Sequence, residues 1–224
     1  MLASVSARPS LVIATPGAEP LAENGYAATL LLDAWASLDR PTLDASEEAL
    51  RRWMAAAALT RGAADGGVVV LCGAPMHTTL PVVEALVRWD PVWFAARELA
   101  ERVELSLPPT VRMAQLVGPR AAVQQAVELA GLGPEVERLG PLPWAPPWAP
   151  PVGPGVSNAS GGSGGSTQAS EGTEDQPRIQ LLLRTSLTDG PSLAAALTHM
   201  KALRSARKDK IAIGVRVDPT DGFS

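Results

Sequence analysis

Residues 145–177 cannot belong to a packed core, and this interruption limits what the rest of the chain can form. The segment begins rich in proline and tryptophan, continues as a Ser/Gly-rich run from Gly155 to Ser170, and ends in acidic residues. It holds too little apolar surface to offset the conformational entropy lost on ordering. A flexible chain of this length spans roughly 30 Å from end to end. We therefore expect a disordered insert that leaves a domain and returns to it.

The residues on either side of the insert predict one small α+β domain over 107–224. Alternating or continuous apolar residues indicate the strands, and apolar residues on one side of a 3.6-residue repeat indicate the helices. The predicted elements are a strand over 111–117, a helix from Pro119, a poorer strand over 137–143, a strand over 178–184, a helix from Pro191 and a strand over 211–217. This order is the split βαβ, ferredoxin-like pattern, with the insert in its central hairpin.

Residues 1–83 predict only part of a second, α/β domain. Apolar runs at 11–15, 28–33 and 68–72 are typical of buried strands in a parallel sheet. A helix is expected after Asp44, which resembles a capping box with Glu47, and its inward residues are Leu50, Trp53, Met54 and Ala57. Three strands with little more than one helix cannot cover both faces of a sheet, so this region looks like half of a domain.

A connecting helix over about 91–105 is expected within a linking region at 84–106. Asp90 is a favourable N-cap, and Pro91 suits the first helical position. Val92, Ala95, Leu99 and Val103 would form its apolar face.

Charge is distributed unevenly along a chain whose net charge is −4. From Arg178 onward there are eight Lys/Arg and four Asp/Glu, a net of +4, so the remainder carries −8. Any surface that attracts a polyanion is therefore expected near the C-terminus. The candidate DNA-binding residues are Lys201, Arg204, Arg207, Lys208, Lys210 and Arg184. The alternative is a solvated helix end, where cations favour the helix dipole.

Aromatic residues beside the insert leave two interpretations open. Trp144 and Trp148 lie in its Pro-rich flank, where they could stack on nucleic-acid bases. They could equally pack against the small domain, which is the default expectation.

The sequence offers no catalytic constellation and no metal site. It lacks a Gly-x-x-x-x-Gly-Lys-Ser/Thr phosphate loop. The single cysteine, Cys72, and the two histidines, His77 and His199, have no second donor at metal-ligand spacing. No apolar run reaches the roughly 18 residues that span a membrane, so we expect a cytoplasmic protein.

The order of short motifs resembles the C-terminal portion of the PriA (primosomal protein N′) family, in particular its actinobacterial members. The segment 11–20 with Asp33 is similar to helicase motif V and the following strand, and 47–53 to the helix before motif VI. Further similar segments are 85–90, 94–102, 107–109, 139–143, 205–208 and 215–219. The resemblance covers nearly the whole chain.

This resemblance implies a remnant of the second RecA-like helicase lobe followed by a C-terminal domain like that of ribosomal protein S10. Such a protein would bind forked and single-stranded DNA, help assemble the primosome during replication restart, and contact the single-strand-binding protein. ATP and zinc are implied only for full-length members, whose nucleotide-binding lobe and zinc-binding cysteines we expect upstream of Met1. No cofactor is expected in this chain.

The chain departs from the motor motifs of active members. Where motif V has Lys-Gly, this sequence has Ala18-Glu19-Pro20. Motif VI would carry paired arginines that stabilise the phosphoryl-transfer transition state, whereas the region 56–64 keeps only Arg61.

Three hypotheses follow. The first is a non-catalytic DNA-binding fragment of a replication-restart protein. The second is the C-terminal part of an active ATP-dependent 3′–5′ DNA helicase whose nucleotide-binding lobe lies upstream. The third is a protein-interaction module in which the Pro/Trp-rich and acidic insert is a ligand for another domain.

Overall fold

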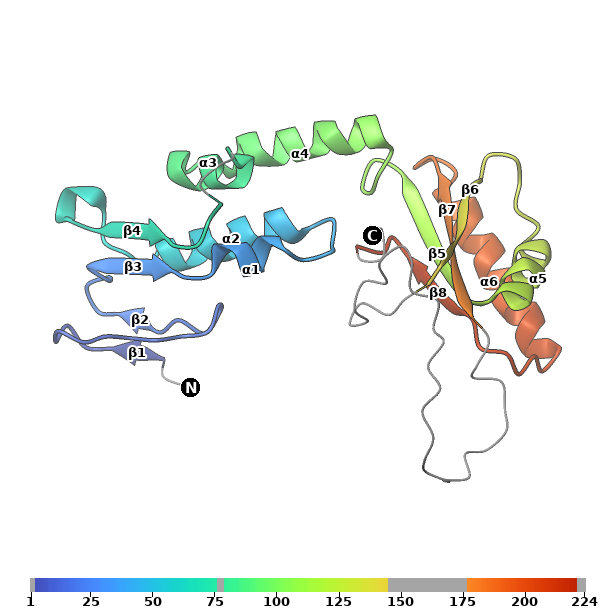
Figure 1. Cartoon of the computed structure of the whole chain (residues 1–224), viewed down its shortest axis with the longest axis horizontal. Coiled ribbons are helices and arrows are strands. Elements are labelled where there is room, and N and C mark those ends of the chain that lie inside the picture. The colour runs from blue at the N-terminus through green and yellow to red at the C-terminus, as the bar shows by residue number, and fades with distance from the viewer. Residues whose placement is uncertain (1–2, 76–78, 145–176, 221–224) are drawn as a thin grey trace, which may run out of the picture. The chain divides into compact units, whose positions relative to one another are not determined.

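The computed structural model describes residues 3–75, 79–144 and 177–220 (Figure 1). The chain divides into two compact units, one comprising Met1–Glu101 with Thr220–Ser224 and the other Arg102–Pro219. The dividing point lies inside one helix, whereas the sequence placed boundaries at 84 and 107; the domain division by function stays a prediction. The expected insert lies outside the described residues except for Pro177.

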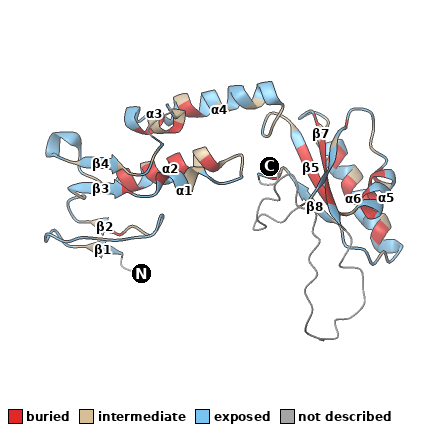
Figure 2. Cartoon of the chain, viewed as in Figure 1, coloured by how far each residue is buried: buried red, intermediate tan, exposed pale blue. Residues whose placement is uncertain are grey.

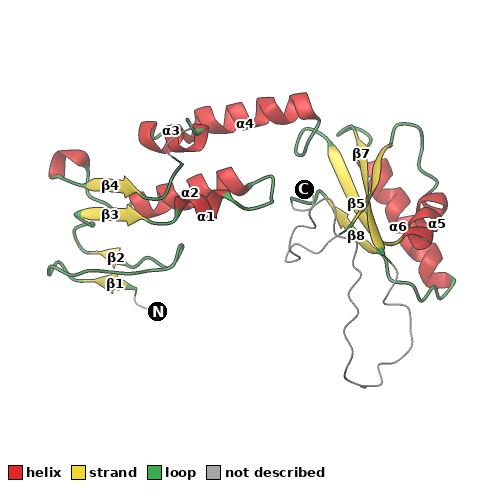
Figure 3. Cartoon of the chain, in the orientation of Figure 1, coloured by secondary structure: helices red, strands yellow, loops and turns green. Residues whose placement is uncertain are grey.

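The first unit, unit 1, is a mixed α/β structure with two small parallel sheets (Figure 3). Strand β1 pairs with β2 and strand β3 with β4, both in parallel. Its elements are β1 (Ser4–Val5), β2 (Leu21–Ala22), β3 (Ala28–Leu31), α1 (Ala34–Leu38), α2 (Ala45–Ala57), a 3₁₀ turn (Ala63–Asp65), β4 (Val68–Leu71), α3 (Pro81–Arg88) and the part of α4 (Pro91–Leu105) up to Glu101.

Helix α2 organises the core of unit 1. Its buried residues recur at helical spacing, with Leu50 and Trp53 on the inward side, and Met54 packs partly buried against the same cluster. Phe94 of α4 and Ala85 of α3 complete this core. The predicted helix is confirmed, but the predicted capping box is wrong, since the Asp44 side chain makes no capping hydrogen bond.

The prediction of three buried strands in unit 1 is partly wrong. Residues 11–15 form no strand, and Leu11 and Ile13 are 88% and 90% exposed. Strands β3 and β4 do form and pair in parallel, but the three valines of β4, 68–70, are exposed. Apolar composition shows only that a strand can be buried. Burial itself requires a neighbouring layer, and none covers β4 among the described residues.

Helix α4 has the predicted bounds and the predicted start. The backbone N–H of Trp93 donates to Oδ1 of Asp90 over 2.9 Å, so Asp90 caps the first turn. The expected apolar face is not packed, because Val92, Leu99 and Val103 are 77%, 48% and 60% exposed (Figure 2).

The second unit, unit 2, is built on one antiparallel sheet with strand order β6-β7-β5-β8. Its elements are β5 (Arg112–Pro119), α5 (Arg120–Ala130), β6 (Glu137–Pro143), β7 (Arg178–Thr185), α6 (Gly190–Ala206) and β8 (Gly214–Val217). The predicted strand–helix–strand–strand–helix–strand order is confirmed. The last strand is shorter than expected, because residues 211–213 precede β8 as irregular backbone.

The core of unit 2 lies between this sheet and helices α5 and α6. Alternate residues of the two central strands point into it, including Leu116 of β5 and Leu183 of β7. Val123 of α5 and Met200 of α6 meet them, and all four side chains are almost fully buried.

Truncation of one central side chain tests whether this core stands apart from that of unit 1. We expect Leu183→Ala to lower the free energy of unfolding of unit 2 by about 2–5 kcal/mol, because it leaves a cavity. Hydrogen exchange would show faster exchange in β5 and β7, with α2 protected as before. Equal loss of protection in α2 would contradict two separate cores.

One carboxyl group of α2 is held ionised by its neighbours. Hydrogen bonds from Arg51 and Arg52, at 2.7 and 2.6 Å, together with their charges, lower the pKa of Glu48 to about 2. The folded pKa lies below the ordinary value, so this interaction stabilises unit 1 above about pH 4.5 and is lost as the pH falls towards 2.

An NMR titration should place the Glu48 midpoint near 2, and Arg51→Ala should raise it. A wild-type midpoint near 4.5 would contradict the pairing.

Candidate nucleic-acid interface

The register of the sheet brings two arginines to one end of unit 2. Pro119, the last residue of β5, pairs with Arg178, the first residue of β7. Because α5 begins at the next residue, Arg120 lies at this same end. Both arginines are exposed.

The connection from α6 to β8 lies at this end too (Figure 1). Gly214 pairs with Val117, and a Cβ added to Gly118 would meet Cγ1 of Ile213 at 3.4 Å. Lys210 is three residues before Ile213, which limits their Cα separation to about 11 Å. We call the exposed cations gathered here the basic end: Arg120, Arg178, Arg207, Lys208 and Lys210.

Backbone hydrogen bonds fix the start of this connection. The N–H of Asp209 donates to the carbonyl of Arg204 over 3.1 Å, and that of Lys208 to the carbonyl of Ser205 over 3.0 Å. These two bonds form a Schellman motif, which closes α6 with one residue in the left-handed region. Lys208 takes that position, with φ 52°, where glycine is usual. The end of the helix therefore holds an exposed cation in a defined place.

Two of the six predicted DNA-binding residues have their guanidinium groups engaged within unit 2. Arg204 is buried; it pairs with Asp209 at 2.8 Å and donates to the carbonyl of Ile211 at 2.6 Å. Arg184 lies near the opposite end of β7, where it pairs with Glu137 and donates to the carbonyl of Ser106. Their placement gives both side chains a structural role.

The other four predicted residues are exposed. Arg207, Lys208 and Lys210 belong to the basic end, and Lys201 lies on α6 little more than one turn before its last residue. The predicted cluster therefore splits, and three of its members come together with two arginines that the sequence did not nominate.

A groove opens at the basic end between the first turn of α5 and the insert-proximal ends of β6 and β7. It has a volume of about 480 Å³ and is lined by Arg120, Ala121, Gln124, Pro143, Pro177, Arg178 and Ile179. Beside it, the Arg178 guanidinium carbon lies 4.9 Å from the ring centroid of Trp144. Trp148, the other aromatic residue considered for base stacking, lies outside the described residues.

The nominated remnant of the motor, Arg61, lies in unit 1 after α2. Its Nε donates to the carbonyls of Asn24 and Gly25 over 3.2 and 3.3 Å, and the side chain is exposed. Its own carbonyl lies so close to Gly67 that a Cβ there would clash with it. The loop carrying Arg61 is thus tied to its neighbours through backbone contacts.

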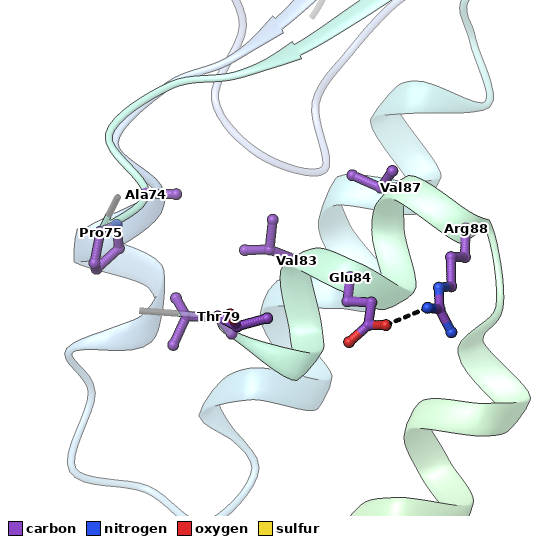
Figure 4. A pocket seen from close by; sticks show the side chains of 8 residues that line it. Ala74, Pro75, Thr79, Val83, Glu84, Val87 and Arg88 are labelled. Carbon is purple, nitrogen blue, oxygen red and sulfur yellow. Dashed lines mark ion pairs between the residues drawn. The ribbon is translucent and has the colours of Figure 1, made fainter. Parts of the chain in front are cut away.

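A second hollow, in unit 1, flanks α3 (Figure 4). It encloses about 290 Å³, and its charged lining residues, Glu84 and Arg88, pair with each other at 2.6 Å. Arg88 also lies over the ring of Trp93, 5.7 Å from its centroid. The remaining lining is mostly apolar, and we assign no chemistry to this hollow.

Other kinds of site find no support among residues 3–75, 79–144 and 177–220. No group of three or more His, Cys, Asp or Glu side chains there is arranged to hold a metal ion. Within the same ranges, no helix combines the length and apolar character needed to cross a membrane. His77 lies outside the described residues.

The charge pattern of the sequence does not single out Arg120 and Arg178, because it marks only a run of cations along the chain. Arg178 was counted within the basic C-terminal region, but Arg120 lies in the part of the sequence with net negative charge. Only the pairing of β5 with β7 joins them. The signal that could have found them was the predicted split βαβ order, which places the start of the first helix beside the start of the third strand.

Substitution of Lys208 tests the geometry at the end of α6. We expect Lys208→Gly to raise the free energy of unfolding by up to about 1 kcal/mol, because glycine adopts a positive φ without the steric cost of a Cβ. Urea denaturation of the full chain measures this change. Lys208→Ala, which keeps the Cβ, serves as the control and should show no gain. A clear loss of stability in the glycine variant would contradict the left-handed conformation.

The chain is similar to proteins of a known family. Residues 103–220 match the family described as primosomal protein N C-terminal domain. The probable replication restart protein PriA of Mycobacterium leprae is 41% identical over 215 residues, covering 96% of this chain and 30% of the relative. The protein of the same description from Mycobacterium tuberculosis H37Rv is 41% identical over 227 residues, covering 98% and 31%. The chain spans about 30% of the length of these relatives, and it belongs to the primosomal protein N (PriA) family.

Proposed function

We propose that this chain is the DNA-binding, non-motor part of a replication restart protein, and that unit 2 contacts DNA phosphates through the basic end. The observation that supports this proposal is that five exposed cations lie at one end of the sheet: Arg120 at the start of α5, Arg178 at the start of β7, and Arg207, Lys208 and Lys210 in the α6–β8 connection. The mycobacterial relatives that align with nearly the whole chain are named as probable replication restart proteins, which supports the same function.

The electrostatics of the basic end favour a polyanion. The carboxylate within the α6–β8 connection, that of Asp209, is taken by Arg204 and by the backbone N–H of Ile211. It therefore does not neutralise the exposed cations on either side of it. Within residues 3–75, 79–144 and 177–220, no carboxylate forms an ion pair with these five cations. Exposed cations at one end of a sheet attract phosphates, and the attraction weakens with salt through counterion release.

We further propose that unit 1 is a remnant of the second RecA-like motor lobe, and that the C-terminal domain resembles ribosomal protein S10. The parallel pair of β3 and β4 beside α2 supports the first comparison, and the split βαβ sheet supports the second. Motif V lacks its Lys-Gly, and Arg61 donates to backbone carbonyls in its own unit. On these grounds we propose no ATP hydrolysis by this chain itself.

The second candidate function is the C-terminal part of an active ATP-dependent helicase. One observation favours it: the chain spans only about 30% of the relatives, so a motor could be completed by other sequence. The exposed valines of β4 fit a lobe that receives a further layer. DNA-dependent ATP hydrolysis by a full-length protein would support this candidate, and its absence would remove it. The resemblance also suggests the single-strand-binding protein and other primosome proteins as partners.

Fluorescence anisotropy with labelled forked and single-stranded DNA tests the proposed function. We expect binding at low salt that weakens steeply as salt rises. Lys208→Gly combined with Lys210→Ala should weaken binding and reduce the slope of log affinity against log salt by about 0.7–0.9 for each lost phosphate contact. Since Lys208→Gly should not destabilise unit 2, lost binding could not be attributed to unfolding.

The matched control is Arg138→Ala, which removes an exposed cation at the opposite end of the sheet, where Arg138 pairs with Leu183. Its affinity and salt slope should equal those of the wild type. Binding that does not depend on salt, or no binding even at low salt, would refute the proposal.

A further inference from the structure

We propose that the groove at the basic end is a subsite for one nucleotide of single-stranded DNA, whose phosphate contacts Arg120 and Arg178 and whose base stacks beside Trp144. This inference rests on the proposed DNA-binding function and adds the type of strand and the residues that distinguish it. The sequence alone does not nominate Arg120, and it does not bring Arg120, Arg178 and Trp144 to one place.

Among the described residues that line the groove, the charged ones have one sign. Its two charged lining residues are both arginines, and they come from separate elements, Arg120 from α5 and Arg178 from β7. The rest of the lining is Gln124 with apolar side chains. A guanidinium offers several N–H donors in a plane, which suits the oxygens of a phosphate. Two such groups around one groove therefore fit a phosphate better than a neutral or cationic ligand.

The first turn of α5 adds donors at the same place. Pro119 occupies the N-cap position and supplies no side-chain hydrogen bond, so no side chain caps the first turn. Amides of a first helical turn, together with the helix dipole, favour an anion. The uncapped first turn of α5 adds support for a phosphate site, but the main evidence is the pair of arginines.

Trp144 adjoins the groove through its contacts with Arg178, which is one of the lining residues. Its backbone N–H donates to the carbonyl of Arg178 over 3.0 Å, which continues the β6–β7 pairing by one residue. Its ring is covered on one side by the Arg178 guanidinium, 4.9 Å from the centroid. Trp144 is partly exposed as a residue, so it is accessible from solvent beside the Arg178 guanidinium. An aromatic ring and a guanidinium plane at one site are the surfaces on which unstacked bases lie.

The combination distinguishes a single strand from a duplex. Phosphates are accessible in both, so the arginines alone would bind either. The bases of a duplex are stacked on each other and cannot lie against a protein ring without being unstacked. A groove with two arginines and an aromatic ring beside it is therefore expected to bind single-stranded DNA more tightly than duplex DNA.

Binding of a short oligothymidylate and of a duplex of the same length to the full chain tests this inference. We expect Trp144→Ala to weaken oligothymidylate binding about fivefold or more, the loss expected for one base–aromatic stack, and to leave duplex affinity unchanged. Arg120→Ala should weaken both. Trp144→Phe, which keeps a ring, should retain most of the affinity, and Arg138→Ala should retain all of it.

The outcomes separate this inference from the function on which it rests. If the wild type binds no DNA, the proposed function fails and the subsite with it. If the wild type binds DNA but Trp144→Ala keeps the same ratio of oligothymidylate to duplex affinity, only the subsite is overturned. A third arm uses a labelled acidic peptide in place of DNA. Peptide binding that is lost in Arg120→Ala and Trp144→Ala, with DNA binding unchanged, would assign the groove to a protein ligand and overturn the inference.

Discussion

The antiparallel pairing of β5 with β7 determines both the core and the candidate interface of unit 2. Eight pairs from Arg112–Thr185 to Pro119–Arg178 join strands that lie on either side of the insert. The same register places Leu116 and Leu183 on the side of the sheet that α5 and α6 cover. It also sets Arg120 beside Arg178. Slipping this pair by one residue would turn the inward side chains to the other face and separate the two arginines.

The two units differ in how completely their apolar residues are covered. In unit 2 the sheet has helices on one face and a continuous buried cluster. In unit 1 the exposed residues include the valines of β4, and the apolar face of α4 is also bare. Large exposed apolar surfaces mark places where a further layer or partner packs. This contrast supports the proposals that unit 2 binds DNA and that unit 1 is a remnant of a motor lobe.

Local patterns predicted the elements well where the deciding interactions are local. The helix over 91–105 was predicted with its bounds, because the Asp90 cap and Pro91 act within one turn. The βαββαβ order followed from apolar periodicity on both sides of the insert. The prediction failed at Leu11–Thr15, because a strand needs a partner that composition cannot supply.

The candidate site was less predictable for the same reason. Arg204 lies in the basic run, yet it is buried because Asp209 and the carbonyl of Ile211 fold back onto it. Arg184 is similarly engaged by Glu137. Charge along a chain does not tell which cations point outwards, and Arg120 becomes part of the site only through strand pairing. The family resemblance supplied a function but not these positions.

We propose that DNA contacts the end of the sheet where β5 ends and β7 begins. Amide NMR spectra of the full chain titrated with single-stranded DNA test it most directly. The account predicts that the largest shift changes occur at Arg120, Arg178 and Lys208, while Arg138 and Arg184 change little. Shift changes concentrated at the opposite end of the sheet, or confined to unit 1, would contradict it.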